Sequence, residues 1–207
     1  MKTVDPAAGT ESMDVLPENR LFVALLHHPV HNKEGEVVTT SITNLDIHDI
    51  ARSARTFGLG GFWVVHPIPG MRALADRIVW HWREGLGGQT NPSRREAMAL
   101  VRTCPDIHHV LTEVEQQTGE IPLLVATSAR AGPGALSFAE LRRRLQNPGP
   151  PRLLILGTGY GLATPLLDRC EEHLESVRGV AGYNHLSVRA AAAILFARLA
   201  FGPTGNP

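Results

Sequence analysis

The chain has 207 residues, of which 43% are hydrophobic, and its 20 Lys and Arg balance its 20 Asp and Glu to a formal net charge of zero. This composition excludes fibrous, collagen-like and wholly disordered proteins, and the length fits one or two domains. The longest apolar stretch, residues 190–197, is far shorter than the roughly 18 apolar residues of a membrane span. Because the net charge is zero, a polyanionic partner would have to be met by local clusters of cations.

Residues 1–19 mix acids, Pro and Gly and lack the basic start and apolar centre of a secretory signal, so we expect a flexible leader there. Residues 20–202 show no internal repeat or break in composition and are expected to form a single domain, with residues 203–207 as a tail. Cys104 and Cys170 are too few for a disulfide framework and lack metal-ligand spacing. We therefore expect a cytoplasmic protein without membrane contact and without a bound metal.

The first part of the chain alternates between predicted strands and a predicted helix. Short apolar runs at residues 21–28 and 61–67 are typical of buried strands. Between them, residues 43–57 predict a helix that begins at a Thr or Asn cap and has one apolar face. That face consists of Ile47, Ile50, Ala51, Ala54 and Phe57. Strand, helix and strand in this order predict a parallel sheet.

The alternation continues to the end of the chain. Helices are predicted at residues 71–83, 93–103 and 107–119, with the Gly-rich residues 85–93 as a loop. Ser137 and Glu140 have the spacing of a reciprocal capping box. The later elements begin with a strand at 121–128, a helix at 138–146 and a strand at 152–157. A helix follows that has Thr164 as its N-cap and Pro165 as its first residue. The last elements are a strand near 174–177 and a helix at 186–201.

The Gly-rich turn at residues 157–161 is the first candidate ligand site. Glycines between a strand and a helix let backbone amides approach a ligand, and a helix start favours anions. The GxGxG spacing does not match the dinucleotide fingerprint, because position 162 is Leu, and no Lys follows as in a P-loop. Residues 128–130 and the glycine-containing loop 178–185 could meet this turn at one edge of the sheet, where parallel sheets bind ligands.

Four segments in order carry a resemblance to a known family: TNLDIHDIARSARTFG at 43–58, LVATSAR at 124–130, ILGTGYGL at 155–162 and RGVAGYNHLSVRAAAAILFARL at 178–199. Together they resemble the SPOUT superfamily of S-adenosylmethionine-dependent RNA methyltransferases, in particular its bacterial stand-alone branch. The resemblance covers nearly all of residues 20–201. It implies a three-layer α/β fold around a parallel sheet with a C-terminal trefoil knot, S-adenosylmethionine as cofactor, structured RNA (tRNA or rRNA) as substrate, and a homodimer.

Carried over by position, the resemblance assigns the cofactor to three loops. Their residues are Thr127, Ser128, Leu156, Gly157, Thr158, Gly159, Gly161, Val177, Gly179, Gly182, Tyr183, Asn184, Leu186 and Ser187. Backbone groups would hold the adenine and the methionine moiety, which would explain the glycines. Four arginines are the candidates for RNA contact: Arg52, Arg55, Arg130 and Arg189.

Arg52 lies where many 2′-O-methylating relatives carry a functional Arg. Two departures leave the acceptor atom open: the relatives have Asn where this chain has Asp46, and Ser-Leu-Asn where it has Tyr183, Asn184 and His185. Methyl transfer needs a group that accepts any proton released, and Arg is a poor base. Four residues are rival candidates for that base: Asp46, His48, Asp49 and His185.

Two other functions stay open: a non-catalytic SPOUT-fold protein that binds RNA or the cofactor, and a nucleotide-binding α/β oxidoreductase. Several further features have mainly structural interpretations. The pairs His27–His28 and His108–His109 are expected at the surface or at helix caps, and residues 142–144 on a solvated helix face. The three Trp are expected in the core or a helix interface, with base stacking as the less favoured alternative. The small face of the last helix, Ala190, Ala193, Ile194 and Ala197, is expected in the core or at a dimer seam.

Overall fold

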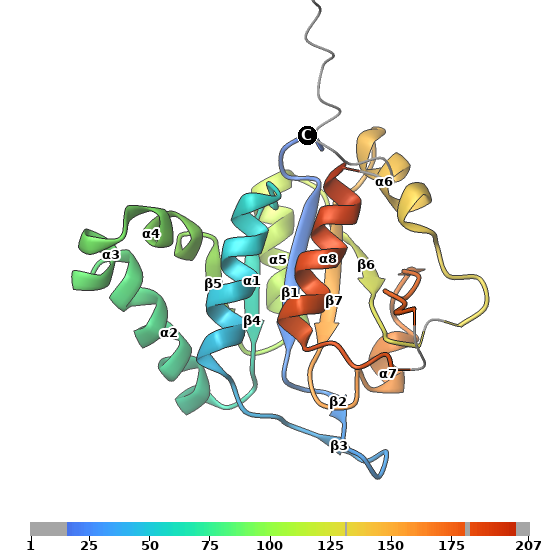
Figure 1. The fold of residues 1–207 in the computed structure, drawn as a ribbon, viewed down its shortest axis with the longest axis horizontal. Coiled ribbons are helices and arrows are strands. Elements are labelled where there is room, and N and C mark those ends of the chain that lie inside the picture. Colours follow the sequence, from blue (N-terminus) through green and yellow to red (C-terminus); the bar gives the residue numbers. More distant parts are fainter. Residues whose placement is uncertain (1–15, 131, 181–182, 202–207) are drawn as a thin grey trace, which may run out of the picture.

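A computed structural model describes residues 16–130, 132–180 and 183–201. Most of the predicted leader, the predicted tail and the candidate Gly182 lie outside these residues. The described chain forms a six-stranded parallel sheet in the order β5-β4-β1-β7-β6-β8 (Figure 1). The strands are β1 Leu21–Leu26, β4 Phe62–Val65, β5 Val101–Cys104, β6 Leu123–Ala126, β7 Arg152–Gly157 and β8 Glu172–His173; β2 Val30–His31 and β3 Val37–Val38 form a separate antiparallel pair.

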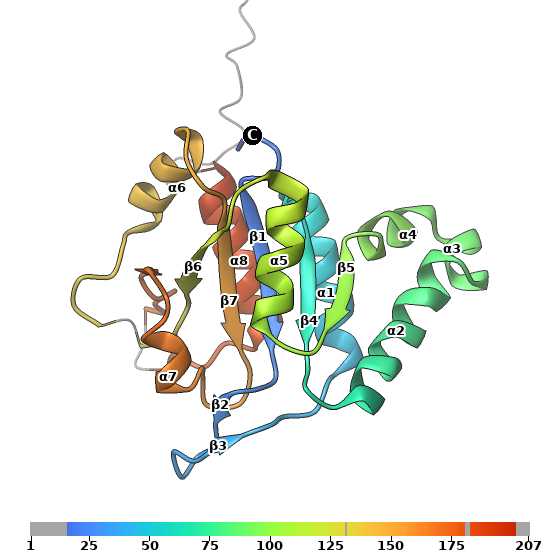
Figure 2. The ribbon, with the colours of Figure 1, turned by 180° about the vertical axis from the view of Figure 1, so that it is seen from behind.

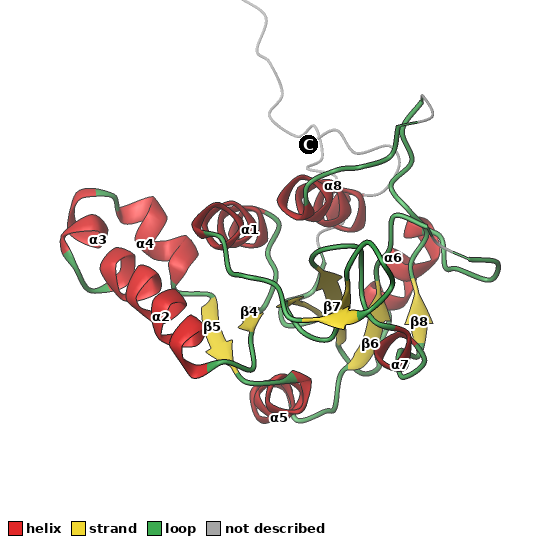
Figure 3. Cartoon of the chain, turned by 90° about the horizontal axis from the view of Figure 1, so that it is seen from below, coloured by secondary structure: helices red, strands yellow, loops and turns green. Residues whose placement is uncertain are grey.

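Helices cover both faces of the sheet, which gives three layers (Figures 2 and 3). Helices α1 and α8 lie on one face and α5 on the other, while α2, α3 and α4 extend beyond the β5 edge. The bounds are α1 Asn44–Thr56, α2 Pro69–Arg83, α3 Leu86–Thr90, α4 Pro92–Met98, α5 Ile107–Thr118, α6 Phe138–Gln146, α7 Thr164–Leu167 and α8 Val188–Phe201. The predicted parallel α/β architecture is therefore confirmed. No helix in the described ranges is long and apolar enough to cross a bilayer.

Strand β1 shows why this fold needs continuous apolar strands. All six of its residues are buried. Leu21, Val23 and Leu25 belong to the core beneath α1 and α8, while the alternating residues Phe22, Ala24 and Leu26 belong to the core beneath α5. Because side chains alternate between the faces of a strand, a strand covered on both sides must be apolar at every position.

The structure corrects several predicted elements. The helix predicted at 93–103 ends at Met98, and β5 begins at Val101. The loop predicted at 85–93 contains α3, and the last strand lies at residues 172–173 instead of 174–177. For the two strands tertiary pairing decided the outcome: β5 pairs with β4, and β8 pairs with β6. At α7 the cap position is Ala163, and Thr164 is already helical.

Two predictions about aromatic and histidine side chains were wrong. Trp63 is fully buried and Trp82 packs against the core, but Trp80 is 62% exposed on α2. His27, expected at the surface, is fully buried at the end of β1. The apolar run LFVALLHH places His27 in register with the core, because β1 is covered on both faces there.

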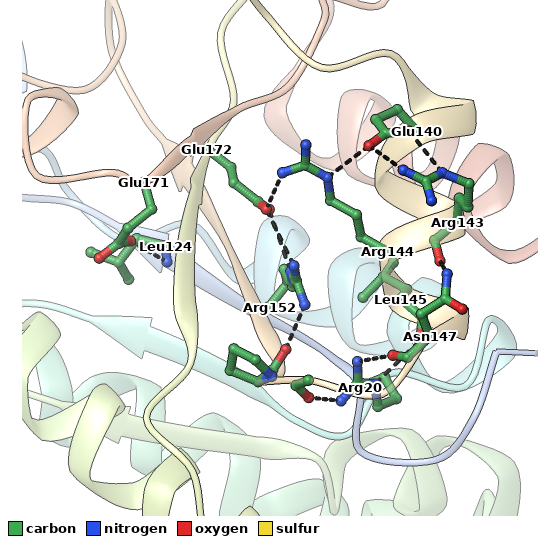
Figure 4. Close-up of polar contacts among 12 residues, drawn as sticks. Arg20, Leu124, Glu140, Arg143, Arg144, Leu145, Asn147, Arg152, Glu171 and Glu172 are labelled. Atoms are coloured by element: carbon green, nitrogen blue, oxygen red, sulfur yellow. Dashed lines mark hydrogen bonds and ion pairs between the residues drawn. The ribbon is translucent and has the colours of Figure 1, made fainter.

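An ion-pair network joins α6 to the sheet (Figure 4). Glu172, which is buried, binds Arg152 at 3.3 Å and Arg144 at 2.8 Å. Ser137 caps the Glu140 amide at 3.1 Å as predicted, but the Glu140 carboxylate binds Arg143 and Arg144 instead of returning to the cap. These two guanidinium groups lower the pKa of Glu140 to about 2. Arg144 is therefore a structural residue as well as part of a solvated face.

Candidate functional site

The three loops predicted to hold the cofactor meet in space. Strands β6 and β7 are parallel neighbours, so residues 127–130 and 157–162 leave the sheet at the same edge. The Thr127 hydroxyl donates to the Ile155 carbonyl oxygen at 2.9 Å. The third loop joins them, because the Asn184 side-chain amide donates to the carbonyl oxygen of Ala129 at 3.0 Å. Carboxyl-end loops of neighbouring parallel strands are where such sheets bind small ligands.

The Gly-rich turn packs against β2. Its Gly161 carbonyl oxygen accepts from the His31 amide at 2.8 Å, and the Tyr160 amide donates to the His31 carbonyl oxygen at 2.9 Å. Gly159 has φ +60°, and a Cβ there would lie 2.9 Å from that same carbonyl oxygen. Gly161 has φ +109° with nothing within 4 Å of its Cβ position. Gly159 is thus needed for packing within the chain, whereas the surroundings of Gly161 leave room for a ligand.

Beneath this turn lies a polar layer in which only Thr158 was among the predicted site residues. The Thr158 hydroxyl donates to the Leu26 carbonyl oxygen at 3.1 Å and is also hydrogen-bonded to the Thr40 hydroxyl. His66 accepts from the Ile68 amide on Nδ1 at 3.1 Å and contacts the Thr40 carbonyl oxygen through Nε2 at 3.0 Å. The Nε2 nitrogen therefore carries the proton. These residues come from separate segments, so no local motif could have revealed the layer.

His27 extends the polar layer into the core. Its Nδ1 lies 3.2 Å from the Val65 carbonyl oxygen, and its ring centroid is 5.4 Å from that of His66. Burial lowers the pKa of His27 to about 4 and also lowers the pKa of His66. Both imidazoles are neutral at physiological pH, and together with Thr40 they fix the strand ends under the turn.

The candidate cofactor loops expose several large apolar side chains. They are Tyr160, Val180, Tyr183 and Leu186. The backbone contribution differs among the candidates: the side chain of Leu156 is buried in the core, so this residue can offer only backbone atoms, whereas Ser128 and Gly179 are exposed. Exposed rings and open backbone at a Gly-rich edge fit a ligand with an adenine ring and polar ends, as S-adenosylmethionine has.

Arg189, at the start of α8, binds two of the candidate bases on α1. Its Nη1 lies 3.2 Å from Asp46 Oδ1, and its Nε lies 3.4 Å from Asp49 Oδ2. The Thr43 hydroxyl donates to the other carboxylate oxygen of Asp46 instead of capping the helix backbone. Asp46 and Asp49 are thus held in an ion-pair network between α1 and α8, and Arg189 is engaged in it.

The other candidates occupy three different environments. His48 is buried against Trp82, and burial lowers its pKa, so it is a neutral packing residue in this structure. His185 is exposed, with its ring 5.1 Å from that of Tyr183 in the third cofactor loop. Arg55 binds Glu96 of α4, and Arg130 is exposed beside Ser128.

Arg52 is exposed and lines a hollow of about 470 Å³ between α1 and α8. Ser187, from the third cofactor loop, lines the same hollow. The remaining lining residues are Asp49, Ser53, Thr56, Phe57, Arg189, Ala190 and Ala193. The structure thus places Arg52 on a surface that continues into the candidate cofactor loops, while Arg55 and Arg189 are ion-paired.

Solved structures identify the fold. The chain resembles the SpoU methyltransferase AviRb from Streptomyces viridochromogenes in complex with AdoMet (TM-score 0.56, 17% identity, 92% of this chain and 61% of the other). A probable methyltransferase from Bordetella pertussis matches with TM-score 0.55 and 17% identity over 88% of this chain and 93% of the other. The chain therefore has the SPOUT fold; the knot stays a prediction.

Sequence comparison adds the family. A family model for SAM-dependent RNA methyltransferases matches residues 20–201, and the chain belongs to this family. An uncharacterized protein of Aquifex aeolicus is 36% identical over 89% of this chain and 90% of its own length. This membership confirms the predicted cofactor and favours a methyltransferase over the oxidoreductase alternative.

Two relatives carry a specific name. Proteins of Oleidesulfovibrio alaskensis and Nitratidesulfovibrio vulgaris, each named tRNA (guanine-N(1)-)-methyltransferase, are 46% and 45% identical over 88% of this chain. The match covers only 42% of each relative, so the chain spans less than half their length. More than half of each relative therefore lies outside the matched region.

Proposed function

We propose that this chain transfers a methyl group from S-adenosylmethionine to a nucleotide of structured RNA. The observation that carries the proposal is the meeting of three loops of the family-matched region at one sheet edge, linked by the Asn184–Ala129 hydrogen bond. When bound, S-adenosylmethionine supplies an electrophilic methyl group on its sulfonium. The chain then has to hold the cofactor, align the RNA and accept any proton that the acceptor atom releases.

The loop residues divide into three groups by what they offer the cofactor. Backbone atoms at Leu156, Gly157 and Gly161 would hold its polar ends, and Thr127 and Thr158 fix the strand ends from which the loops leave. Exposed Tyr183 and Leu186 would cover an apolar part. Val177 packs against the core and anchors the third loop, which ends in Ser187 beside the hollow.

Arg52 is the proposed RNA-positioning residue, because it is exposed in the hollow that Ser187 also lines. Its guanidinium would hold a phosphate or orient the acceptor atom. His185 is the proposed proton acceptor: it is exposed beside the cofactor loops, whereas Asp46 and Asp49 are held by Arg189 and His48 is buried. Two relatives are named as tRNA methyltransferases, so tRNA is the first substrate to test. Because the chain matches only part of these relatives, guanine N1 is one of several acceptor atoms to test.

The proposed assembly is a homodimer in the cytoplasm. Ala190, Ala193, Ile194 and Ala197 form a half-buried face of α8, separate from the buried face that includes Leu195, Phe196 and Leu199. A small, half-exposed apolar face allows close approach of a second helix, and a two-fold axis would use it twice. Such a seam borders the hollow, since Ala190 and Ala193 also line it.

The decisive experiment incubates the purified chain with S-adenosylmethionine carrying a labelled methyl group and with tRNA and rRNA from a strain that lacks this gene. We expect label in one RNA class, and mass spectrometry of its nucleosides then identifies the methylated atom. Cofactor binding by calorimetry without transfer to either RNA would support the non-catalytic alternative. Binding of NAD in place of S-adenosylmethionine would refute the proposal.

A further inference from the structure

Helices α2, α3 and α4 project from the β5 edge of the sheet, away from the candidate cofactor loops (Figures 1 and 3). One side of α2 holds this segment to the body, because Ala75 and Val79 are buried and Trp82 packs against the core. Arg77 and Trp80 are three residues apart and both exposed, so they are neighbours on the opposite side of the helix. The segment therefore presents a cation and an aromatic ring together to solvent.

Large apolar side chains are unusually exposed here. Trp80 is 62% and Leu86 73% exposed, and Ile68 and Leu74 are also among the exposed large apolar residues. Scattered single apolar residues are normal on a protein surface, so it is Trp80, with the cation Arg77 beside it, that points to a binding surface. An exposed Trp adds a flat ring that can stack on another ring.

The charge of the same segment is positive, although the whole chain is neutral. Residues 69–104 contain six Arg and three acids. The acids have partners: Asp76 accepts from the Thr103 hydroxyl at 2.7 Å, Glu84 lies 3.8 Å from Arg83, and Glu96 binds Arg55 of α1. The segment therefore carries a net positive charge, and most of its arginines lie on α2 and α4.

Two of those arginines are available to an anion. Arg77 and Arg95 make no side-chain hydrogen bond or ion pair with any residue that the structure describes. Arg94 is half-buried and stacks 4.5 Å over the ring of Trp82, which packs against the core. Arg77 is also the neighbour of the exposed Trp80 ring on α2. An unpaired guanidinium group beside an exposed aromatic ring is a combination that binds single-stranded nucleic acid, since a phosphate meets the cation and a base meets the ring.

We infer that this surface, consisting of Arg77 and Trp80 on the solvent side of α2, binds a single-stranded stretch of the substrate RNA, with an unpaired base stacked on Trp80. The inference rests on the proposed function for the identity of the RNA. A second copy of the chain fits less well, because a two-fold contact would place the same arginines against each other. The surface would hold the RNA at a distance from the reacting nucleotide and so contribute to choosing the substrate.

Fluorescence anisotropy with labelled bulk tRNA tests the inference, using Trp80→Ala, Trp80→Leu and Trp80→Phe. Loss of one stacked base weakens binding about tenfold, so we expect that loss for Ala and for Leu. Phe keeps a π-face and should stay within about threefold of the wild type. An apolar protein contact would instead tolerate Leu. Ile121→Ala, at an exposed apolar residue just before β6, is the control and should bind as the wild type.

Charge variants test the phosphate contact separately. Arg77→Ala should make the slope of log affinity against log salt shallower by about 0.7, the value for one phosphate of a single strand. Glu84→Gln, at the C-cap of the same helix, should not weaken binding. All variants should keep the thermal unfolding midpoint of the wild type, because the substituted side chains are exposed.

Three results would overturn the inference. In the first, the wild type binds and methylates RNA, and Trp80→Ala and Trp80→Leu bind it with the same affinity. This surface is then not an RNA contact, while the proposed function stands. If Trp80→Ala instead dissociates a dimer in light scattering and leaves RNA affinity unchanged, the surface is an interface between copies. If the wild type binds no RNA at all, both the inference and the proposed function fail.

Discussion

Arg189 of α8 binds Asp46 of α1 at 3.2 Å across 143 residues of sequence. The same guanidinium reaches Asp49 at 3.4 Å, so one side chain holds two carboxylates on the helix that also carries Arg52. Arg189 lies two residues after Ser187, where the third candidate cofactor loop ends. This contact therefore fixes the helix that carries Arg52 relative to the third candidate cofactor loop.

Replacing Arg189 should destabilise the chain more than replacing an exposed arginine. In Arg189→Ala the Asp46 carboxylate, whose side chain is 12% exposed, loses its guanidinium, and we expect a loss of about 1–2 kcal/mol in the free energy of unfolding in urea. Arg55→Ala breaks the exposed pair with Glu96 and should cost at most about 0.5 kcal/mol. Equal effects of the two substitutions would show that the Arg189 contact is not structural.

Arg52→Ala should reduce methyl transfer far more than cofactor binding. A side chain that aligns RNA for transfer acts mainly in the transition state, so turnover should fall by about 100-fold or more while cofactor affinity stays within a few-fold. Single-turnover methylation and calorimetry measure the two quantities. Arg55→Ala is the matched control, one turn along α1, and should retain turnover. Unchanged methylation in Arg52→Ala would reject its assignment, and the same assay on His185→Ala tests the proposed proton acceptor.

Gly159 should be intolerant of substitution even without cofactor. Its φ of +60° and the His31 carbonyl oxygen 2.9 Å from a Cβ make Gly159→Ala strained, and we expect a loss of about 2 kcal/mol in unfolding free energy. Gly70→Ala has open space and no positive φ, so its stability should stay within about 0.5 kcal/mol. Loss of cofactor binding in Gly159 variants would therefore need a stability measurement before it could locate the site. A fully stable Gly159→Ala would contradict the packing described here.

Stability should fall between pH 7 and pH 5 because of His27. Burial lowers the pKa of His27 in the folded chain from 6.5 to about 4, so the unfolded chain takes up a proton first as the pH falls. The neutral imidazole thus favours folding above pH 6.5, and this contribution is lost toward pH 4. The expected loss from pH 7 to pH 5 is about 2 kcal/mol.

Urea unfolding at several pH values measures this effect. His27→Gln removes the titration and should flatten the curve in that window, although the lowered pKa values of His48 and His66 leave a smaller slope of the same sign. Glu140, with its pKa near 2, loses its contribution only below pH 4.5. An unchanged slope in His27→Gln would mean that the pKa of His27 is the same in the folded and the unfolded chain.

Ala193→Glu should dissociate the proposed homodimer. Ala193 is half-buried on the small face of α8, and a charge there would meet its own copy across a two-fold axis. We expect the mass from light scattering to halve at micromolar protein. Ala139→Glu, at an exposed position of α6, should not change the mass. A monomeric wild type would exclude the proposed dimer. An Ala193→Glu variant that is still dimeric would place the dimer interface elsewhere.

Much of the fold follows from local sequence. The continuous apolar runs of β1, β4 and β7 require cover on both faces, and the periodicity of Ile47, Ile50, Ala51 and Ala54 places one side of α1 in the core, as the structure confirms. The order of four modest motifs also led to the family. Short elements such as β5 and β8 could not be predicted in the same way, because their backbone conformation depends on pairing with β4 and β6.

For the candidate site, the sequence by itself determined which loops carry glycine and polar residues and that they follow strands of one parallel sheet. Only the tertiary structure decided which side chains are available. Arg189 binds both Asp46 and Asp49, Arg55 binds Glu96, and Arg52 stays exposed. The polar layer of Thr40, His27 and His66 and the exposed Trp80 were also decided there. The physical reason is that ion pairs and burial join residues far apart in the chain, whereas periodicity and spacing report only on neighbours.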